Sequence, residues 1–183
     1  MAQLVFLTGA PGSGKSTLAR LLVDERPLAL LLDLDTLRAQ LGGWKADPTA
    51  AGIRARQLGL VAARAQLERG GDVVVPQLVL RHGLIEQFRD LAGETGAAFV
   101  LVALVSSADE ASERFRARTS SADPNHRDAV QLQAAPGAAP VEDLYTDMLE
   151  MLSAFPGTRY VESVPGEVLA TLSALREATA GPS

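Results

Sequence analysis

The 183-residue chain contains no cysteine and no long apolar run. Without cysteine it has no disulfide, no thiolate metal site and no cysteine nucleophile, which fits a cytoplasmic protein. No apolar segment is long enough to span a bilayer, and the N-terminus lacks the basic start of a signal peptide, so we expect no membrane association. The net charge of -5 argues against a nucleic acid partner, because surfaces that wrap nucleic acid are usually basic.

Histidine and asparagine are also scarce, and this excludes two further classes of protein. The two histidines, His82 and His126, are far apart and have no cysteine partners, so a zinc site is not expected. The single asparagine, Asn125, is followed by His126, and the guanine-reading N-K-x-D motif of regulatory GTPases is therefore absent.

Apolar segments alternate with helical patterns along the chain. We expect strands at residues 4–8, 28–32, 73–76, 97–105 and 159–164, and helices at 15–24, 36–41, 49–69, 82–92, 109–119, 141–154 and 166–178. This alternation predicts a single α/β domain over residues 1–183, with a central, mainly parallel five-stranded sheet between helices. In such sheets ligands bind beyond the carboxyl ends of the strands. Residues 120–140 are rich in polar residues, proline and glycine, and we expect a lid at about 109–140.

The most informative segment follows the first predicted strand. It reads GAPGSGKST and is a complete phosphate-binding loop, G-x-x-x-x-G-K-S, followed by a helix. Its glycines let the backbone curl around a polyphosphate, and its amides point at the phosphate oxygens. Lys15 is expected to reach the β- and γ-phosphates, and Ser16 to bind Mg²⁺. The predicted nucleotide-binding residues are Gly9, Ala10, Pro11, Gly12, Ser13, Gly14, Lys15, Ser16 and Thr17.

Lysine usage supports this interpretation. Of the 17 lysines and arginines only two are lysines, Lys15 and Lys45. A compact ammonium fits a phosphate cradle, whereas a planar guanidinium does not, so a lysine at this position is informative in an arginine-rich chain.

Two carboxylates, Asp33 and Asp35, follow the second apolar run. If the strand persists, both point to the same side. Phosphoryl transfer needs a carboxylate that orients the acceptor hydroxyl and takes its proton, and Asp35 is the candidate. Asp33 would support Mg²⁺ through a water molecule or bind substrate, and Arg38 would contact an anionic or hydroxylated substrate. The alternatives are that Asp35 caps the helix at 36–41, which leaves Asp33 unexplained, and that Arg38 is a solvated surface residue.

Arginines are concentrated between residues 114 and 127. Arg114 and Arg118 are four residues apart and share one face of the predicted helix at 109–119. An arginine that closes over ATP stabilises charge on the transferring phosphoryl group, and a lid that carries it excludes water. Arg118 is the first candidate for this catalytic role and Arg114 the second. The alternative is a surface helix in which these arginines pair with neighbouring glutamates.

Together, the phosphate loop, the LDLDTLR stretch and the ERFRAR segment resemble the small P-loop kinases and phosphotransferases grouped around phage polynucleotide kinase, zeta toxin and chloramphenicol phosphotransferase. Such chains are often called AAA-family ATPases. The resemblance spans most of residues 1 to 120. It implies a three-layer P-loop kinase fold that uses ATP and Mg²⁺, with Asp35 as the base, Arg38 at the substrate, and Arg114 and Arg118 in the lid.

The sequence departs from this group at one position. In many relatives the third strand ends in an aspartate that helps to hold Mg²⁺, whereas here Val75 is followed by Pro76 and Gln77. Asp72 is at the start of that strand, the wrong end for the site. Mg²⁺ is then expected to rest on Ser16, the phosphates and Asp33. Gln77 would contact substrate or bond the backbone.

These features favour an ATP-dependent phosphotransferase that moves the γ-phosphate to a hydroxyl of a small molecule. Segments 36–60 and 77–85 would form the acceptor pocket. The alternative enzyme is a kinase of 5′-hydroxyl nucleic acid ends, against which the acidic charge argues. A third interpretation, motivated by the missing acid after Val75, is a non-catalytic ATP-binding regulatory protein. The motifs do not distinguish ATP from GTP.

Overall fold

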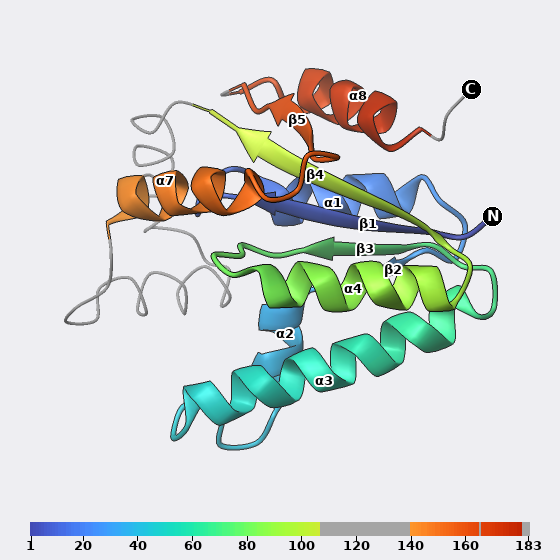
Figure 1. Cartoon of the computed structure of the whole chain (residues 1–183), viewed down its shortest axis with the longest axis vertical. Helices are drawn as coiled ribbons and strands as arrows, with labels where there is room; N and C mark the ends of the chain where they lie inside the picture. Colours follow the sequence, from blue (N-terminus) through green and yellow to red (C-terminus); the bar gives the residue numbers. More distant parts are fainter. Residues whose placement is uncertain (107–139, 165, 181–183) are drawn as a thin grey trace.

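The computed structural model describes residues 1–106, 140–164 and 166–180 (Figure 1). In these residues the helices and strands are β1 Gln3–Gly9, α1 Lys15–Asp24, β2 Leu30–Leu31, α2 Leu34–Ala39, α3 Pro48–Leu67, β3 Val73–Pro76, α4 His82–Glu94, β4 Ala98–Val105, α7 Val141–Leu152, β5 Arg159–Glu162 and α8 Val168–Thr179. The expected lid, apart from its last residue, lies outside the described residues, and so do Arg114 and Arg118. No helix in the described ranges is long and apolar enough to cross a membrane.

All five strands form one sheet in the order β2-β3-β1-β4-β5, and every neighbouring pair is parallel. β1 lies in the middle and pairs with β4 along its whole length, from Gln3 opposite Ala98 to Gly9 opposite Leu104. Because the strands are parallel, their carboxyl ends meet at one edge of the sheet. This confirms the predicted α/β fold and directs the loops after β1, β2 and β3 to the same edge.

Helices cover both faces of the sheet, which explains why the strands are apolar without alternation. On one face Val5 and Leu7 pack with residues of α1 and α8. On the other face Leu4 and Phe6 pack with residues of α3, α4 and α7, and the rings of Phe6 and Phe88 meet edge to face at 5.6 Å. Figure 1 shows α4 and α7 in front of the sheet and α1 behind it, which is the expected three-layer arrangement.

The second strand differs from the prediction. It was expected over residues 28–32, but β2 contains only Leu30 and Leu31, which pair with β3 alone. Leu28 is 92% exposed and has a left-handed φ of 59°, so it belongs to the turn that enters the strand. An edge strand with one neighbour has few ladder hydrogen bonds to extend it, and hydrophobicity alone overestimates its length.

A polar network joins four elements at the amino ends of the strands. Arg26 donates to Gln3 Oε1 at 2.8 Å, to Asp72 Oδ2 at 3.1 Å and to Thr179 Oγ1 at 2.9 Å. Asp72 also accepts a hydrogen bond from the backbone amide of Gln3. The expectation that Asp72 lies at the wrong end of the sheet for catalysis is therefore confirmed, and its role here is structural.

Candidate active site

The phosphate loop joins β1 to α1 at the carboxyl edge of the sheet. Gly12 and Gly14 have φ values of 86° and 88°, in the left-handed region that residues with a Cβ rarely adopt. Gly14 is the N-cap of α1, and no side chain caps the helix. The first amides of α1 are thus directed at the space in front of the loop, where a helix N-terminus favours an anion.

The phosphate loop packs closely against β4 and is hydrogen-bonded to the turn after β5. A Cβ built on Gly9 would lie 2.5 Å from Ser13 Oγ and 3.1 Å from Leu104 Cβ on β4. From the turn after β5, Ser163 Oγ donates a hydrogen bond of 3.0 Å to the carbonyl of Ser13. Ser13 is buried, and its hydroxyl finds no partner among the described residues. The loop is therefore preformed, and its glycines, amides and lysine fit a polyphosphate chain.

Lys15 extends across this loop. Its Nζ donates a hydrogen bond of 2.8 Å to the carbonyl of Ala10, five residues earlier. Its charge also acts on Asp33, which follows β2. Burial raises the pKa of Asp33, backbone hydrogen bonds from Thr36 and Asp35 oppose the rise, the charge of Asp35 adds to it, and the charge of Lys15 lowers it. The phosphate loop and the aspartate segment therefore lie within electrostatic reach of each other.

Asp33 caps α2, a role that the sequence analysis did not give it. It lies in extended backbone and is the N-cap of α2, and its Oδ1 accepts hydrogen bonds from the amides of Asp35 at 2.9 Å and Thr36 at 3.0 Å. The alternative interpretation of the sequence, in which Asp35 caps the helix, is wrong, because Asp33 is the cap. Because the chain is already helical at Asp35, the two carboxylates do not share one face of a strand. The carboxylate of Asp35 is consequently not used for capping.

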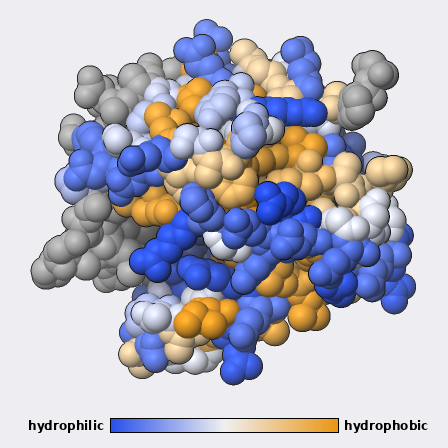
Figure 2. All heavy atoms as spheres, viewed as in Figure 1, coloured by the Kyte–Doolittle hydropathy of each residue, from blue (hydrophilic) through white to orange (hydrophobic). Residues whose placement is uncertain are grey.

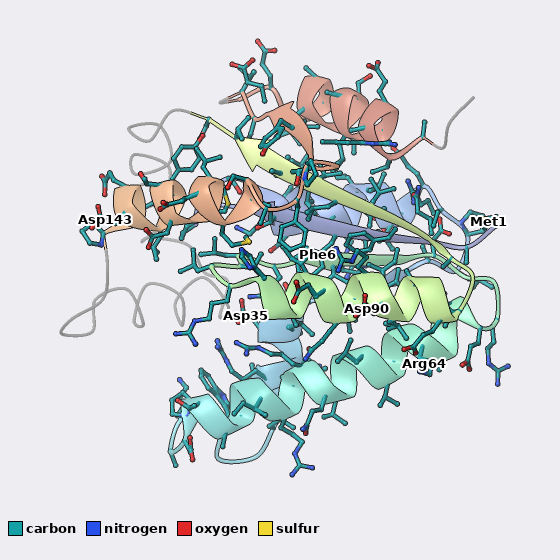
Figure 3. The ribbon with its side chains drawn as sticks, in the orientation of Figure 1. Met1, Phe6, Asp35, Arg64, Asp90 and Asp143 are labelled. Atoms are coloured by element: carbon teal, nitrogen blue, oxygen red, sulfur yellow. The ribbon has the colours of Figure 1, made fainter. Side chains whose placement is uncertain are left out.

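Asp35 instead pairs with Arg38 across one turn of α2. Asp35 Oδ1 lies 3.2 Å from Arg38 Nη2, and the two side chains are 54% and 18% exposed. The Arg38 guanidinium also lies over the ring of Trp44, with Cζ 5.0 Å from the centroid. Arg38 is thus a packed residue rather than a solvated one, and it holds the more exposed carboxylate in position. In Figure 3, Asp35 lies towards the end of the sheet to which the strand arrows point, opposite Met1.

Gln77 follows β3 and lies next to β1. Its backbone amide donates to the carbonyl of Leu7 at 3.0 Å, and its side-chain amide donates to the carbonyl of Leu78 at 3.3 Å. Its Oε1 is buried and has no hydrogen-bond partner among the described residues. Gln77 therefore forms hydrogen bonds with the backbone, which was one of the two roles expected for it. Gln77 also lines a pocket.

This pocket has a volume of about 590 Å³ and lies between α3 and the start of α4. Its walls come from residues 53–60 and 77–87, segments that overlap those expected to form the acceptor pocket. The volume is in the range of pockets that take small organic ligands. Figure 2 shows hydrophilic and apolar groups mixed on this side of the molecule, with apolar groups exposed along α3 in its lower part.

The segments that follow the carboxyl ends of β1, β2 and β3 carry Lys15, Asp33, Asp35 and Gln77, as predicted. Arg38 lies within α2, the helix that follows β2. No group of three histidine or acidic residues in the described ranges is arranged to hold a metal ion. The Ser16 hydroxyl, which the sequence analysis expects to bind Mg²⁺, is exposed at the start of α1.

Sequence reasoning missed several residues that shape the site. Val141 of α7 packs against Ala10 of the phosphate loop, and Tyr145 donates a hydrogen bond of 2.5 Å to the carbonyl of Ser106 after β4. Ser163 bonds to the loop from 150 residues away. These contacts join segments that are distant in sequence, and no motif marks them.

The family of the chain follows from its sequence as a whole. A family model described as an AAA domain matches residues 4–137. The chain belongs to this AAA domain family. The match includes the phosphate loop and the Asp35–Arg38 segment. No curated protein matches the sequence.

Solved structures resemble this domain in fold. A chain of the Pnkp1/Rnl/Hen1 RNA repair complex has a TM-score of 0.67 and 18% identity, with 85% of this chain and 47% of that chain covered. A gluconokinase from Sinorhizobium meliloti has a TM-score of 0.58 and 20% identity, with 96% and 94% covered. The tunicamycin resistance protein of Deinococcus radiodurans has a TM-score of 0.61 and 16% identity, with 100% of both chains covered. At these identities the comparisons show a shared P-loop kinase fold. This chain spans about half the length of the chain from the RNA repair complex.

Proposed function

We propose that the protein is an ATP-dependent phosphotransferase that moves the γ-phosphate of ATP to a hydroxyl of a small molecule. The observation that carries the proposal is the grouping at one end of the sheet: the phosphate loop, the Asp35–Arg38 ion pair and the pocket lined by Gln77. An NTP-binding site beside an open carboxylate and a ligand-sized pocket supports transfer to a second substrate rather than nucleotide binding alone.

The phosphate loop would bind and orient the nucleotide. The loop amides and the uncapped N-terminus of α1 face the phosphates, and Lys15 exchanges the Ala10 carbonyl for phosphate oxygens. Mg²⁺, held by Ser16 and the nucleotide, would neutralise charge on the phosphates. Because the loop is packed against Leu104 and bonded by Ser163, little reorganisation accompanies binding.

Asp35 would position the acceptor and take its proton. The acceptor oxygen forms a bond to the γ-phosphorus while the bond between that phosphorus and the β–γ bridging oxygen breaks, which releases ADP. The hydroxyl proton passes to the Asp35 carboxylate. Arg38 keeps this carboxylate oriented from one side, and its own position is fixed by Trp44. Asp35 is half exposed, so an acceptor in solution can reach it.

The test is ADP formation from Mg·ATP in the presence and absence of hydroxylated acceptors, with Lys15→Ala as the blank. The panel contains aminoglycosides, phenicols, nucleosides, sugars and sugar acids. The proposal predicts that at least one acceptor stimulates ADP formation, and that the stimulation is lost in Lys15→Ala. Nucleotide binding without stimulation by any acceptor would favour a non-catalytic regulatory protein.

A kinase of 5′-hydroxyl nucleic acid ends is the second candidate, and one observation favours it. The fold resembles a chain of an RNA repair complex over 85% of this sequence. The acidic net charge opposes it. A 5′-hydroxyl oligonucleotide in the same panel separates the two functions: preference for the oligonucleotide, with a steep loss of binding at higher salt, would support the second candidate.

A further inference from the structure

The charged residues that line the pocket between α3 and α4, among those described, are all positive. Two arginines line it, Arg56 from α3 and Arg81 at the start of α4, and its lining includes no aspartate, glutamate or lysine from the part of the chain that the structure describes. The whole chain has 22 acidic residues and a net charge of -5. A positive pocket in an acidic protein concentrates anions at that place.

Neither arginine forms an ion pair with another described residue. Within the described residues no carboxylate lies within salt-bridge distance of Arg56 or Arg81, whereas Arg64, two turns further along α3, pairs with Glu68 and Glu94. Arg81 also borders a second hollow that contains Asp147 and Glu150, yet it pairs with neither. Both guanidinium groups therefore keep their donors available for a ligand.

The start of α4 adds a second, independent source of positive potential. Arg81 is the N-cap of this 13-residue helix, and the helix has no capping side chain and no acid in its first turn. Gly83 and Leu84, in that first turn, line the pocket. The unpaired amides of a helix N-terminus favour an anion, and here they face the same space as the two arginines.

The other walls of the pocket are neutral. Ile53 is 51% exposed although it is apolar, and Leu60 and Leu84 contribute further apolar surface. Gln57, Gln77 and Gln87 supply amide groups that can bond hydroxyls. At the inner end, Gln77 is bonded to the strand that leads into the phosphate loop. An occupant can therefore present a hydroxyl towards the loop and an anionic group towards the arginines.

The geometry points to an acceptor class: a small hydroxylated molecule with an anionic group, a carboxylate or a phosphate, that Arg56, Arg81 and the N-terminus of α4 bind. This inference rests on the proposed function, in which the same pocket takes the acceptor. Arg56 and Arg81 set the specificity for charge, and the apolar and amide side chains hold the rest of the molecule.

Pairs of probes that differ by one charge test this assignment. Each pair contains an anion and its neutral counterpart. The three pairs are gluconate with sorbitol, 4-(2-hydroxyethyl)benzoate with its amide, and adenosine 3′-monophosphate with adenosine. Binding of each to the full chain with Mg·ADP is measured by calorimetry, and phosphate transfer is measured with Mg·ATP. The first two pairs test for recognition of a carboxylate, and the third pair tests for recognition of a phosphate. Arg56→Gln and Arg81→Gln are compared with Arg54→Gln, a control on the same helix outside the pocket.

In at least one pair the anion should bind about tenfold more tightly than its neutral partner or better, the usual gain from one charge-assisted hydrogen bond. Arg56→Gln and Arg81→Gln should remove most of that difference, and Arg54→Gln should leave it unchanged. Equal binding of both members in every pair, no binding of any probe, or anion binding that neither pocket variant weakens would overturn the inference.

The two proposals fail in different ways. Anion binding that depends on Arg56 and Arg81, without phosphate transfer to any probe, would support the pocket assignment and contradict the phosphotransferase. Transfer to neutral acceptors alone would support the phosphotransferase and contradict an anionic acceptor class.

Discussion

Asp35 Oδ1 lies 3.2 Å from Arg38 Nη2, so the candidate base is held by a neighbour one turn along the same helix. The guanidinium is in turn fixed against Trp44. This arrangement leaves one side of a half-exposed carboxylate open to an acceptor.

Replacing Asp35 with asparagine removes the group that accepts the proton and keeps the size of the side chain. We expect Asp35→Asn to retain ATP affinity and to lower kcat for phosphate transfer by about 100-fold or more, the usual effect of losing a general base. The rate is measured with a saturating acceptor from the panel, and ATP binding by calorimetry. Asp47→Asn, at the N-cap of α3, is the control and should keep the activity. Full activity of Asp35→Asn would exclude Asp35 as the base.

Gly59 on α3 supports this site from a distance. A Cβ at Gly59 would lie 2.5 Å from Leu34 Cδ2, and Leu34 begins the helix that carries Asp35 and Arg38. Overpacking of this kind typically costs about 1–3 kcal/mol, more than the gain of about 0.5–1 kcal/mol from helix propensity, so Gly59→Ala should lower the free energy of unfolding and the transfer rate together. The free energy is measured by urea denaturation.

Gly52 on the same helix is the matched control. A Cβ there meets nothing within 4 Å. Gly52→Ala should therefore stabilise the protein by about 0.5–1 kcal/mol through helix propensity alone. Equal effects of the two substitutions would contradict the close contact between α2 and α3.

The titration of Asp33 gives a dependence of stability on pH. Burial raises the pKa of this carboxyl in the folded state, so its contribution to stability is present below the unfolded pKa and is lost as pH rises through the folded pKa. Asp33→Asn keeps an oxygen that can cap α2 but does not ionise. The variant should therefore gain stability relative to the original protein as pH rises from about 4 towards neutrality. Thermal unfolding of both proteins over this range measures the difference, and a difference independent of pH would refute the assignment.

The hydrogen bond from Ser163 to Ser13 predicts that the turn after β5 supports nucleotide binding. Ser163→Ala leaves the buried carbonyl of Ser13 without this donor, at a cost of about 1 kcal/mol, and loosens the loop. We expect a lower melting temperature and weaker ATP binding. Ser153→Ala, which removes only a local bond at the end of α7, should change neither by a measurable amount. Unchanged ATP affinity in Ser163→Ala would show that the loop is rigid without this bond.

The sequence predicts those structural features that depend on residues close together along the chain. The bounds of α1 at Lys15 and Asp24 were predicted because a glycine loop and an apolar helix face are adjacent in sequence. The bounds of β3 agree for a similar reason, since Val73–Pro76 is a short apolar run between turns. β2 was predicted too long, because its length depends on one neighbouring strand.

The capping role of Asp33 and the contacts of Arg38 were not predictable in the same way. In the sequence alone, Asp33 and Asp35 are equally good candidates for the N-cap of α2. Only the path of the chain after β2 decides which carboxylate accepts the hydrogen bonds from the amides of α2. The ring that packs on Arg38 is six residues away in a turn without a recognisable motif. The positive charge of the pocket lined by Gln77 depends on residues of α3 and α4 that folding brings together.

The most direct test of the central claim follows the phosphate itself. The protein is incubated with Mg²⁺ and ATP labelled at the γ-phosphate, together with an acceptor that stimulates ADP formation, and the products are separated. The account predicts that the label appears on the acceptor in proportion to the ADP formed, and that Lys15→Ala and Asp35→Asn abolish its transfer. Label found only as inorganic phosphate, or transfer that persists in Asp35→Asn, would contradict the account.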